Sequence, residues 1–490
     1  MNLYRSFNKV LLIILVALVH PKAFAQEEST SRSESNGNTV TVTRSHSGTH
    51  RWKNSTGVTN FNIESRGKIE VTDDDRDIKN LSNDGYLEIT KTVFGSKRAI
   101  IIESLGGGKI KKEYYEGRTK MEWDPNGKDW LAEILPAIVR STTLGAEGRV
   151  NRIYAKDGVS GVVEELSKLE GDYTASHYAK LLLEKNIPSA DLSRAIKGIA
   201  DAIESDYYLS TVLQNNVSKL LSTTDAATAF LQATNEIGSA YYKAVVLKEA
   251  ARKLAGSPAQ VKIILQSAAE IDSDYYLSVV LTTLLEQSEL KEESIKELVL
   301  VSKKIPSDYY RTQVLNRALN KTSLSNESLK NVMDAVESIN SAYYKTGVFN
   351  TMAERMTLES DVQIQMINQI KESIDSDYYA AITMKNVLNH QRLSDESFRL
   401  LVNASSEFSS ANYAADVLKT AAEKDLNKNQ LMDILKASSN INSDYYLSEV
   451  LLSLSDQVRN SDATVKDAYR SAAKGIDSDT YYGRAVKAID

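Results

Sequence analysis

The 490-residue sequence contains no cysteine and only five histidines. Thiol catalysis, thiolate metal sites and disulfide bonds are therefore excluded, and stability must come from packing, which a chain of this length can supply. Glycine and proline are scarce in the C-terminal part, where residues 203–490 contain five Gly and two Pro. So few breakers indicate helices that are joined by tight turns.

Long apolar runs are absent except at residues 10–19. Positive residues precede this run and a small-residue cleavage pattern follows it: Arg5, Lys9 and Ala23-Phe24-Ala25. This order predicts a secretory signal peptide at 1–25. The run is too short to cross a bilayer, which takes about 20 residues. We expect a protein exported to the periplasm or the extracellular space, with no membrane insertion after the signal is removed.

The net charge differs between the two parts of the sequence. Residues 39–128 carry 16 Lys and Arg against 13 Asp and Glu, a net charge of +3. Residues 129–490 carry 39 against 49, a net charge of −10. Because an acidic array repels a phosphate backbone, nucleic acid is not expected as a partner.

Residues 39–128 have the sequence pattern of β-strands, and a polar segment precedes them. Residues 26–38 are rich in Ser, Glu and Asn without apolar residues, which predicts a flexible leader. From 39 to 128 apolar residues alternate with polar ones between turn clusters, and Gly106-Gly107-Gly108 is placed to form a hairpin tip. We predict a small antiparallel β-domain of six to eight strands at 39–128, followed at 129–202 by a helical region with an atypical first repeat.

An internal repeat fills residues 203–490. The segment Ile203-Glu204-Ser205-Asp206-Tyr207-Tyr208 returns eight times, at steps of 34, 34, 34, 34, 35, 34, 33 and 35 residues. The later copies begin at Ile237, Ile271, Ile305, Ile339, Ile374, Phe408, Ile441 and Ile476.

Each part of the repeated segment suggests a structural role. The Ser predicts a helix N-cap, the Asp adds negative charge at the positive end of the helix dipole, and the preceding Ile suits a hydrophobic staple. The residue five places after the Ser is always small, which implies that a neighbouring helix approaches closely there. A second helix completes each unit, with start signals such as Ser257-Pro258 and Ser325-Asn326-Glu327. The sequence therefore predicts an α-solenoid of about ten 34-residue helical hairpins.

The unit length equals that of tetratricopeptide repeats, but the Trp, Leu-Gly and terminal Pro positions of that family are missing. A HEAT-like array of helical hairpins describes the pattern equally well. The class of repeat stays open on the sequence alone.

Two stretches resemble known proteins. Phe61-Asn62-Ile63-Glu64 through Tyr86-Leu87-Glu88-Ile89 resembles a β-region of uncharacterised bacterial secreted proteins. Trp130 through Glu170-Gly171-Asp172-Tyr173 is similar to the extracytoplasmic part of some β-lactam-sensor-type metallopeptidase homologues. The resemblance implies fold and compartment, but no peptidase activity, because the HExxH zinc motif and the membrane helices of that family are missing.

Candidate chemistry is sparse. His46 and His50 lie in a strand-like region and make a weak metal pair. Asp73-Asp74-Asp75-Arg76-Asp77 suits either Ca²⁺ or a solvated acidic turn, of which we favour the turn. Lys345-Thr346-Gly347 and Ser471-Ala472-Ala473-Lys474 mimic fragments of penicillin-recognising enzymes, but both fall inside repeat helices. We expect no catalytic residues, no metal and no cofactor, with an unrecognised enzyme activity as the third hypothesis.

The tyrosine pairs are the first candidates for a binding surface, because Tyr offers a large contact area at low entropic cost. At least one Tyr per unit should belong to the core, since both recur with the apolar pattern. The candidates are the second members of the pairs: Tyr208, Tyr242, Tyr276, Tyr310, Tyr344, Tyr379 and Tyr446. We expect a non-catalytic scaffold for a protein or peptide in the cell envelope. The alternative is an adhesin-like or ligand-sensing protein in which the β-domain binds and the array acts as a spacer.

Overall fold

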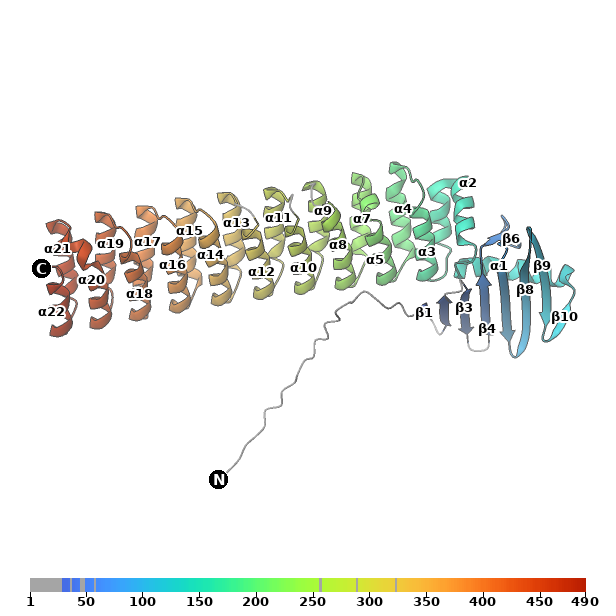
Figure 1. Ribbon diagram of the computed structural model, residues 1–490, viewed down its shortest axis with the longest axis horizontal. Coiled ribbons are helices and arrows are strands. Elements are labelled where there is room, and N and C mark those ends of the chain that lie inside the picture. Colours follow the sequence, from blue (N-terminus) through green and yellow to red (C-terminus); the bar gives the residue numbers. More distant parts are fainter. Residues whose placement is uncertain are drawn as a thin grey trace, which may run out of the picture. The chain divides into compact units, whose positions relative to one another are not determined.

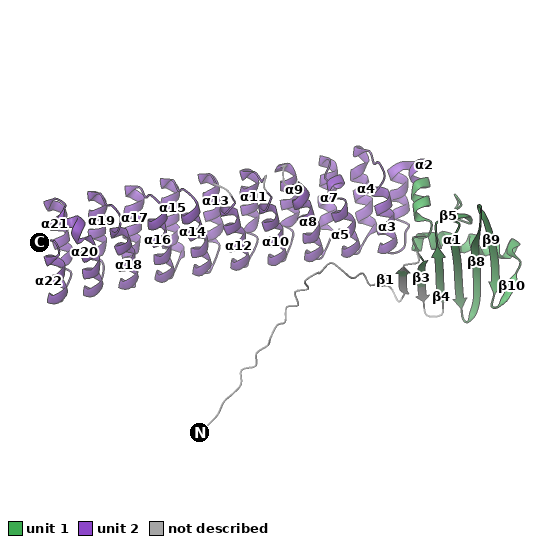
Figure 2. Ribbon diagram, in the orientation of Figure 1, with its two compact units in different colours: residues 1–152 green, residues 153–490 purple. Residues whose placement is uncertain are grey.

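The computed structural model describes residues 29–35, 38–44, 49–56, 59–254, 258–287, 290–321 and 324–490. The expected signal peptide, His46 and Ser257 lie outside the described residues. The chain divides into two compact units, residues 1–152 and 153–490, coloured green and purple in Figure 2.

Unit 1 is built around an antiparallel eight-stranded sheet with the order β1-β2-β3-β4-β7-β8-β9-β10, and β5 pairs with β6 in a separate two-stranded sheet (Figure 1). The strands are β1 (Ser29–Ser35), β2 (Asn38–Arg44), β3 (Thr49–Thr56), β4 (Thr59–Arg66), β5 (Ile69–Val71), β6 (Ile78–Leu81), β7 (Tyr86–Val93), β8 (Ser96–Gly106), β9 (Lys109–Glu116) and β10 (Thr119–Met121). The predicted antiparallel β-domain is confirmed. The three glycines at 106–108 join β8 to β9 with φ values of 82°, 57° and 77°, which glycine adopts without strain.

One face of the large sheet carries the core of unit 1. A cross-strand row of buried residues runs over five strands: Trp52, Ile63, Ile89, Ile100 and Tyr114. Helix α1 (Lys128–Ser141) lies against this core, and the ring of its Trp130 stands 5.6 Å from that of Tyr114. The alternation that predicted strands is thus explained by a sheet with one buried face.

Two boundaries differ from those expected from the sequence. Strand β1 lies inside the segment 26–38 for which a flexible leader was predicted, because backbone pairing with β2 needs no apolar side chains. Unit 1 ends at Arg152 rather than at 128, because Trp130 and its neighbours on α1 pack into the core of the β-domain.

Unit 2 is the predicted α-solenoid, and it consists of two layers of stacked helices (Figure 1). The signature helices begin at the repeated segment and are α3 (Asp172–Leu183), α5 (Asp206–Asn215) with the short α6 (Val217–Leu220), α8 (Ala240–Leu254), α10 (Asp274–Leu285), α12 (Asp308–Leu319), α14 (Ala342–Arg355), α16 (Asp377–His390), α18 (Ala411–Ala422), α20 (Asp444–Arg459) and α22 (Asp479–Lys487). The partner helices alternate with them and are α4 (Ser189–Ala202), α7 (Thr224–Asn235), α9 (Pro258–Ala268), α11 (Glu292–Ser302), α13 (Asn326–Glu337), α15 (Ser360–Ser373), α17 (Asp395–Ser406), α19 (Lys428–Ser438) and α21 (Ala463–Ala473). Helix α2 (Ala146–Leu166) precedes them and is kinked at Gly158, where φ is 63°.

Packing between successive units explains the repeat period. Each signature helix contacts the next signature helix, and each partner helix contacts the next partner helix. In eight of the nine repeats the small residue five places after the Ser is buried and allows the signature helices to approach closely: Ser210, Ala244, Ser278, Thr312, Thr346, Ala381, Ala415 and Ser448. Gly483, at this place in the last repeat, is exposed. No single hairpin could bury its apolar residues alone, so stability comes from stacking. Within the described residues, no helix is long and apolar enough to cross a membrane.

Candidate functional site

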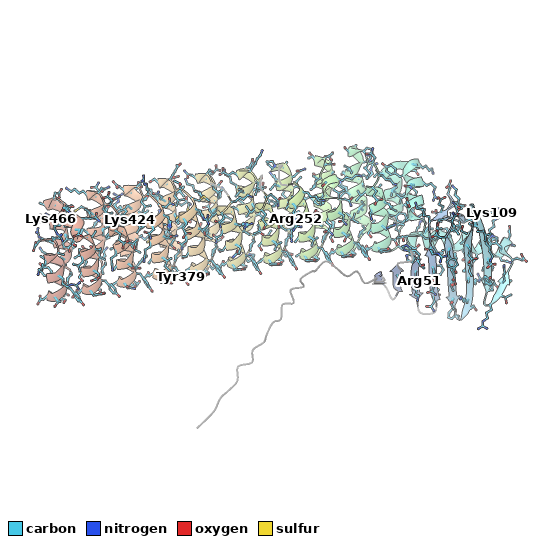
Figure 3. The ribbon with its side chains drawn as sticks, viewed as in Figure 1. Arg51, Lys109, Arg252, Tyr379, Lys424 and Lys466 are labelled. Atoms are coloured by element: carbon cyan, nitrogen blue, oxygen red, sulfur yellow. The ribbon has the colours of Figure 1, made fainter. Side chains whose placement is uncertain are left out.

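The repeated Ser-Asp-Tyr-Tyr segments lie together along one edge of unit 2. Each segment stands at the N-terminal end of a signature helix, and these helices stack in register. Figure 3 labels Tyr379 at this edge, on the lower border of the array. We call this surface the tyrosine edge and define it as the tyrosine pairs, the connectors that precede the signature helices, and the first residue of each signature helix.

The two tyrosines of each pair differ in exposure. The second members, which were the candidates expected from the sequence, are all half-buried: Tyr208, Tyr242, Tyr276, Tyr310, Tyr344, Tyr379 and Tyr446. The first members are between 47% and 61% exposed: Tyr207, Tyr241, Tyr275, Tyr309, Tyr343, Tyr378 and Tyr445. The first tyrosines of the pairs are therefore more accessible than the second tyrosines, which were the candidates expected from the sequence.

Both columns join into one ladder of edge-to-face rings. Each exposed ring contacts the half-buried ring of its own repeat, at centroid distances of 5.0–5.1 Å. It also contacts the half-buried ring of the next repeat, at 5.7–6.2 Å. Edge-to-face pairs stabilise by about 0.5–1.5 kcal/mol beyond area burial. The tyrosines therefore connect repeats and still present an aromatic surface.

The ladder is interrupted once among the described residues. It runs without a gap from Tyr173 to Tyr413. Asn412 then occupies the place of the exposed ring, so no ring links Tyr413 to Tyr446. Beyond the gap, Tyr445 contacts both Tyr446 and Tyr481.

The signature aspartates hold successive repeats together. Asp206 accepts hydrogen bonds from the backbone N–H groups of Gly238 and Ser239, at 3.0 and 2.7 Å. The same contact recurs from Asp172 to Glu204, Asp274 to Ser307, Asp308 to Asn340 and Ser341, Asp377 to Ser410, and Asp444 to Asp477 and Ser478. The sequence predicted only a role for this Asp at the dipole of its own helix, and the contact with the following repeat was missed.

The predicted caps at the signature serines are weak. Ser239, Ser273 and Ser307 accept from the N–H three residues later at 3.5 Å, the outer limit of a hydrogen bond. No side-chain cap bond forms at six others: Ser205, Ser341, Ser376, Ser410, Ser443 and Ser478.

Backbone geometry explains why these serines cap poorly. Eight signature serines have ψ between 110° and 120°. The residues that cap partner helices have ψ between 159° and 172°: Thr223, Ser325, Ser394, Asn427 and Asp462. The cap bonds at the partner helices are accordingly shorter, at 3.0–3.4 Å.

Three cations on the signature helices are buried close to the tyrosine edge. The guanidinium of Arg311 donates to the backbone oxygens of Ile305 and Lys303. The Nζ of Lys345 donates to the oxygen of Ser373 at 2.9 Å, and Lys243 is similarly buried. Burial lowers the pKa of both Arg311 and Lys345. These side chains satisfy the carbonyl groups at the ends of partner helices, so Lys345-Thr346-Gly347 has a packing role.

The acidic turn at 73–77 forms ion pairs within unit 1. Asp75 accepts from Arg149 at 2.7 Å and from Arg152 at 2.7 Å, and Arg149 is almost fully buried. Asp77 pairs with Lys112 at 2.6 Å. The carboxylates of Asp75 and Asp77 are thus occupied by basic side chains. Among the described residues, no group of three or more His, Asp or Glu is arranged to hold a metal ion.

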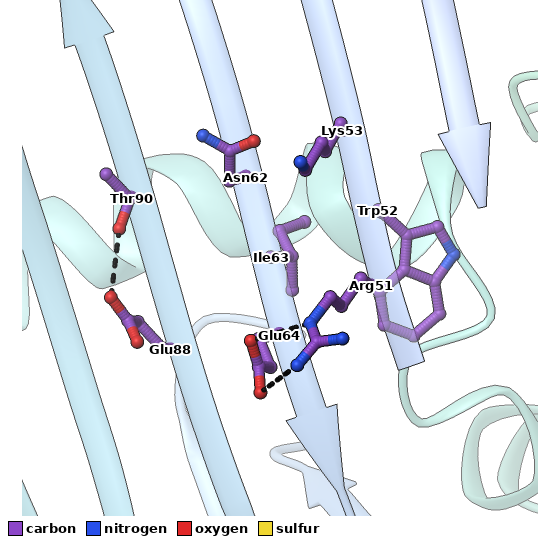
Figure 4. A pocket seen from close by; sticks show the side chains of 8 residues that line it. All are labelled: Arg51, Trp52, Lys53, Asn62, Ile63, Glu64, Glu88 and Thr90. Carbon is purple, nitrogen blue, oxygen red and sulfur yellow. Dashed lines mark hydrogen bonds and ion pairs between the residues drawn. The ribbon is translucent and has the colours of Figure 1, made fainter. Parts of the chain in front are cut away.

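A shallow hollow of about 220 Å³ lies on the large sheet of unit 1 (Figure 4). Arg51 donates to Glu64 at 3.0 and 3.3 Å, and Glu88 accepts from Thr90 at 3.3 Å and from Tyr86 at 2.8 Å. Burial and the hydrogen bond to Glu88 raise the pKa of Tyr86. These polar groups satisfy one another, which leaves a charged but internally paired surface.

Comparisons with known proteins give little further information. No family model matches the chain, and no curated protein matches it. Among solved structures, a protein from work on the computational design of self-assembling cyclic homooligomers is 14% identical to this chain. The match covers 62% of this chain and 94% of the designed one, with a TM-score of 0.12. A score this low supports no conclusion about function, and the resemblance to metallopeptidase homologues stays a prediction.

Proposed function

We propose that this protein is an exported, non-catalytic scaffold whose solenoid binds a protein or peptide in the cell envelope, in the periplasm or outside the cell. The observation that supports the proposal best is the column of half-exposed tyrosines, which recurs in seven repeats of the array. Tyrosine is enriched in protein interfaces because its ring buries a large area and loses few rotamers.

The neighbouring half-buried rings and the signature aspartates support this role. Each exposed ring touches two half-buried rings, which limits its freedom before a partner arrives. A surface that is ordered in advance loses less entropy on binding. A solenoid also offers an extended surface on which one partner can contact several repeats.

Site-specific photo-crosslinking in the native cells tests the binding surface. A photoreactive phenylalanine derivative replaces Tyr241, Tyr309 or Tyr378 in the full chain, and matched variants carry it at Glu359 or Glu423 in connectors at the opposite ends of the helices. We expect the tyrosine positions to give the same discrete adduct and the control positions to give none. Absence of adducts, or equal adducts from both sets, would contradict the proposal.

Export is tested by mass spectrometry of the mature protein. Cleavage after Ala25 would leave Gln26 as the first residue. An intact N-terminus on protein recovered from cells would contradict the export part of the proposal.

The hollow on the sheet of unit 1 supports a second candidate function, an adhesin-like or ligand-sensing β-domain. Lys53 and Asn62 line it beside the paired Arg51 and Glu64 and offer polar groups to a small polar ligand. Photoreactive replacements at Lys53 and Asn62 distinguish this function, since adducts from these positions alone would favour it over the solenoid.

A further inference from the structure

The tyrosine edge is much more acidic than the opposite edge of the array. Between Ile203 and Asp479, the connectors before the signature helices and the first residues of those helices carry 13 Asp and Glu against three Lys. The described connectors before the partner helices α7 to α21, with the first residues of those helices, carry seven acidic against five basic residues. The array therefore concentrates its negative charge along the edge that exposes the tyrosines.

Most of the connector carboxylates at this edge are exposed, although the buried Lys345 ammonium attracts Asp375. Glu407 pairs with Lys371, at 2.9 Å. No salt bridge within the described part of the chain involves six others: Glu204, Glu236, Glu270, Asp272, Asp375 and Asp477. Like charges in a row repel one another, so a cationic partner would relieve this repulsion on binding.

The spacing of the exposed rings matches an extended polypeptide. Tyr207 and Tyr241 both contact Tyr242, at centroid distances of 6.0 and 5.0 Å. Their own centroids are therefore at most about 11 Å apart. They stand on signature helices that contact each other, and packed helices lie about 8–10 Å apart. Three residues of an extended polyproline II chain span a similar ~9 Å. Because polyproline II has three residues per turn, every third side chain of such a segment faces the same side and would meet an equivalent position on the array.

The chemistry of the rings favours cationic side chains at those positions. The face of an aromatic ring carries negative electrostatic potential, which attracts the ammonium of Lys and the guanidinium of Arg. The connector carboxylates beside the rings add a second attraction of the same sign. An anionic polymer would be repelled, and a neutral one would gain nothing from the carboxylates.

We infer that the tyrosine edge binds an extended, basic polypeptide segment, with about three of its residues to each repeat and a lysine or arginine over each exposed ring. This inference rests on the proposed function, since it names the partner chemistry for the same surface.

Fluorescence anisotropy with the full chain tests the partner chemistry. The probe is a labelled serine peptide with lysine at every third position, long enough for roughly six repeats. One comparison peptide has the same composition with all lysines adjacent, and two others carry glutamate or glutamine in place of lysine. We expect the spaced lysine peptide to bind at least about fivefold more tightly than the block peptide, with weakening as salt rises, and the other two not to bind.

Matched variants locate the binding to the edge. Glu204→Gln, Asp272→Asn and Asp375→Asn together should weaken binding about tenfold or more. The control triple Glu359→Gln, Glu423→Gln and Asp425→Asn removes the same charge from exposed positions in the opposite connectors and should change binding less than about twofold.

Replacements of the exposed rings separate the aromatic face from apolar area. Tyr241→Leu, Tyr275→Leu and Tyr309→Leu together should weaken binding about tenfold, because exposed cation–π contacts contribute a few-fold each. The corresponding Tyr→Phe triple keeps the ring face and should bind within about twofold of the original chain.

Several outcomes overturn the inference. Equal weakening by the two acid-to-amide triples would show a general attraction to an acidic protein. If the glutamine peptide bound as tightly as the spaced lysine peptide, the positive charge of the peptide would not contribute to binding. Failure of every lysine peptide would also overturn it. If the photo-crosslinks still form at Tyr241 and Tyr309 in that case, the scaffold function stands with a different partner; if they too fail, both proposals fall.

Discussion

The carboxylate of Asp308 accepts a hydrogen bond of 2.9 Å from the backbone N–H of Ser341, the signature serine of the next repeat. It also accepts from the N–H of Asn340. The contact joins two repeats through a side chain that belongs to one and a backbone that belongs to the other. A nearest-neighbour array depends on such interfaces for its cooperativity.

The first prediction concerns this contact. Asp308→Ala should destabilise the interface by about 1–3 kcal/mol, because it leaves two N–H groups without their charged acceptor. Hydrogen exchange of the Ser341 amide should accelerate accordingly. Asp334→Ala, on the exposed face of α13, is the control and should leave that exchange unchanged.

A substitution that adds this contact can be made in the repeat that lacks it. Ala342 occupies the place of the aspartate one repeat later, and the following serine is Ser376. Asp444 makes the contact across the same 35-residue step, so Ala342→Asp should gain a bond to the Ser376 N–H and slow its exchange. Unchanged exchange in both Asp308→Ala and Ala342→Asp would contradict the role assigned to this column.

The second prediction concerns helix starts. Asn427 forms a capping box with Gln430 at the start of α19, whereas Ser443 makes no side-chain cap bond at the start of α20. Asn427→Ala should cost about 1 kcal/mol, and Ser443→Ala no more than a few tenths. Chemical denaturation of both variants checks the difference, and an equal loss in the two would show that ψ at the cap residue does not control capping here.

The solenoid was predictable from the sequence because the same pattern of apolar and small residues recurs in every repeat. Apolar and small positions such as Ser210 recur at every step of about 34 residues, and only stacked hairpins bury all of them. The partner of Asp308 was not predictable in the same way, because Ser341 lies 33 residues away and a charge at a helix start already has a local explanation.

The exposure of the tyrosines was also beyond sequence reasoning. Tyr207 and Tyr208 are adjacent in the first helical turn, where each residue is rotated by about 100° from the last. Which of the two faces solvent depends on the ring that the next repeat supplies, and here Tyr242 packs against Tyr207 from the side. The failed caps have a similar origin, since ψ at each serine is a property of the connector geometry.

The third prediction is a pH dependence in unit 1. Burial opposes ionisation of Asp75, but the hydrogen bonds from Arg149 and Arg152 outweigh it and hold the pKa of Asp75 below its usual value. Because the folded pKa is lower than the unfolded one, the stabilisation is complete above the unfolded value of about 3.9 and is lost as pH falls through the folded value.

Substitution of Asp75 distinguishes the effect of its ion pair with Arg149 from the protonation of other carboxylates at low pH. Asp75→Asn leaves the buried Arg149 without its carboxylate and should destabilise unit 1 by roughly 3–5 kcal/mol at neutral pH. The folding stability of the variant should also fall less steeply below about pH 4 than that of the original chain. Asp73→Asn removes a largely exposed charge and is the control. Identical acid unfolding of Asp75→Asn and the original chain would contradict the assignment.

The fourth prediction concerns the gap in the tyrosine ladder. Asn412 stands where other repeats carry the exposed ring, and Ala411 beside it lacks the carboxylate that bonds the next repeat. The interface between α18 and α20 therefore lacks both contacts that join signature helices elsewhere. Asn412→Tyr should place a ring between Tyr413 and Tyr446 and stabilise this interface by about 0.5–1.5 kcal/mol. Hydrogen exchange of amides at the start of α20 should slow, while amides in α12 should not change.

The opposite substitution tests the same contact in an intact part of the ladder. Tyr343→Asn removes the ring that touches Tyr344 and Tyr379, so exchange at the start of α16 should accelerate by a comparable free energy. Asn412→Leu adds apolar area without an aromatic edge and should stabilise less than Asn412→Tyr. If leucine and tyrosine stabilise α20 equally, the ladder joins repeats through burial of area alone, and the edge-to-face geometry contributes nothing further.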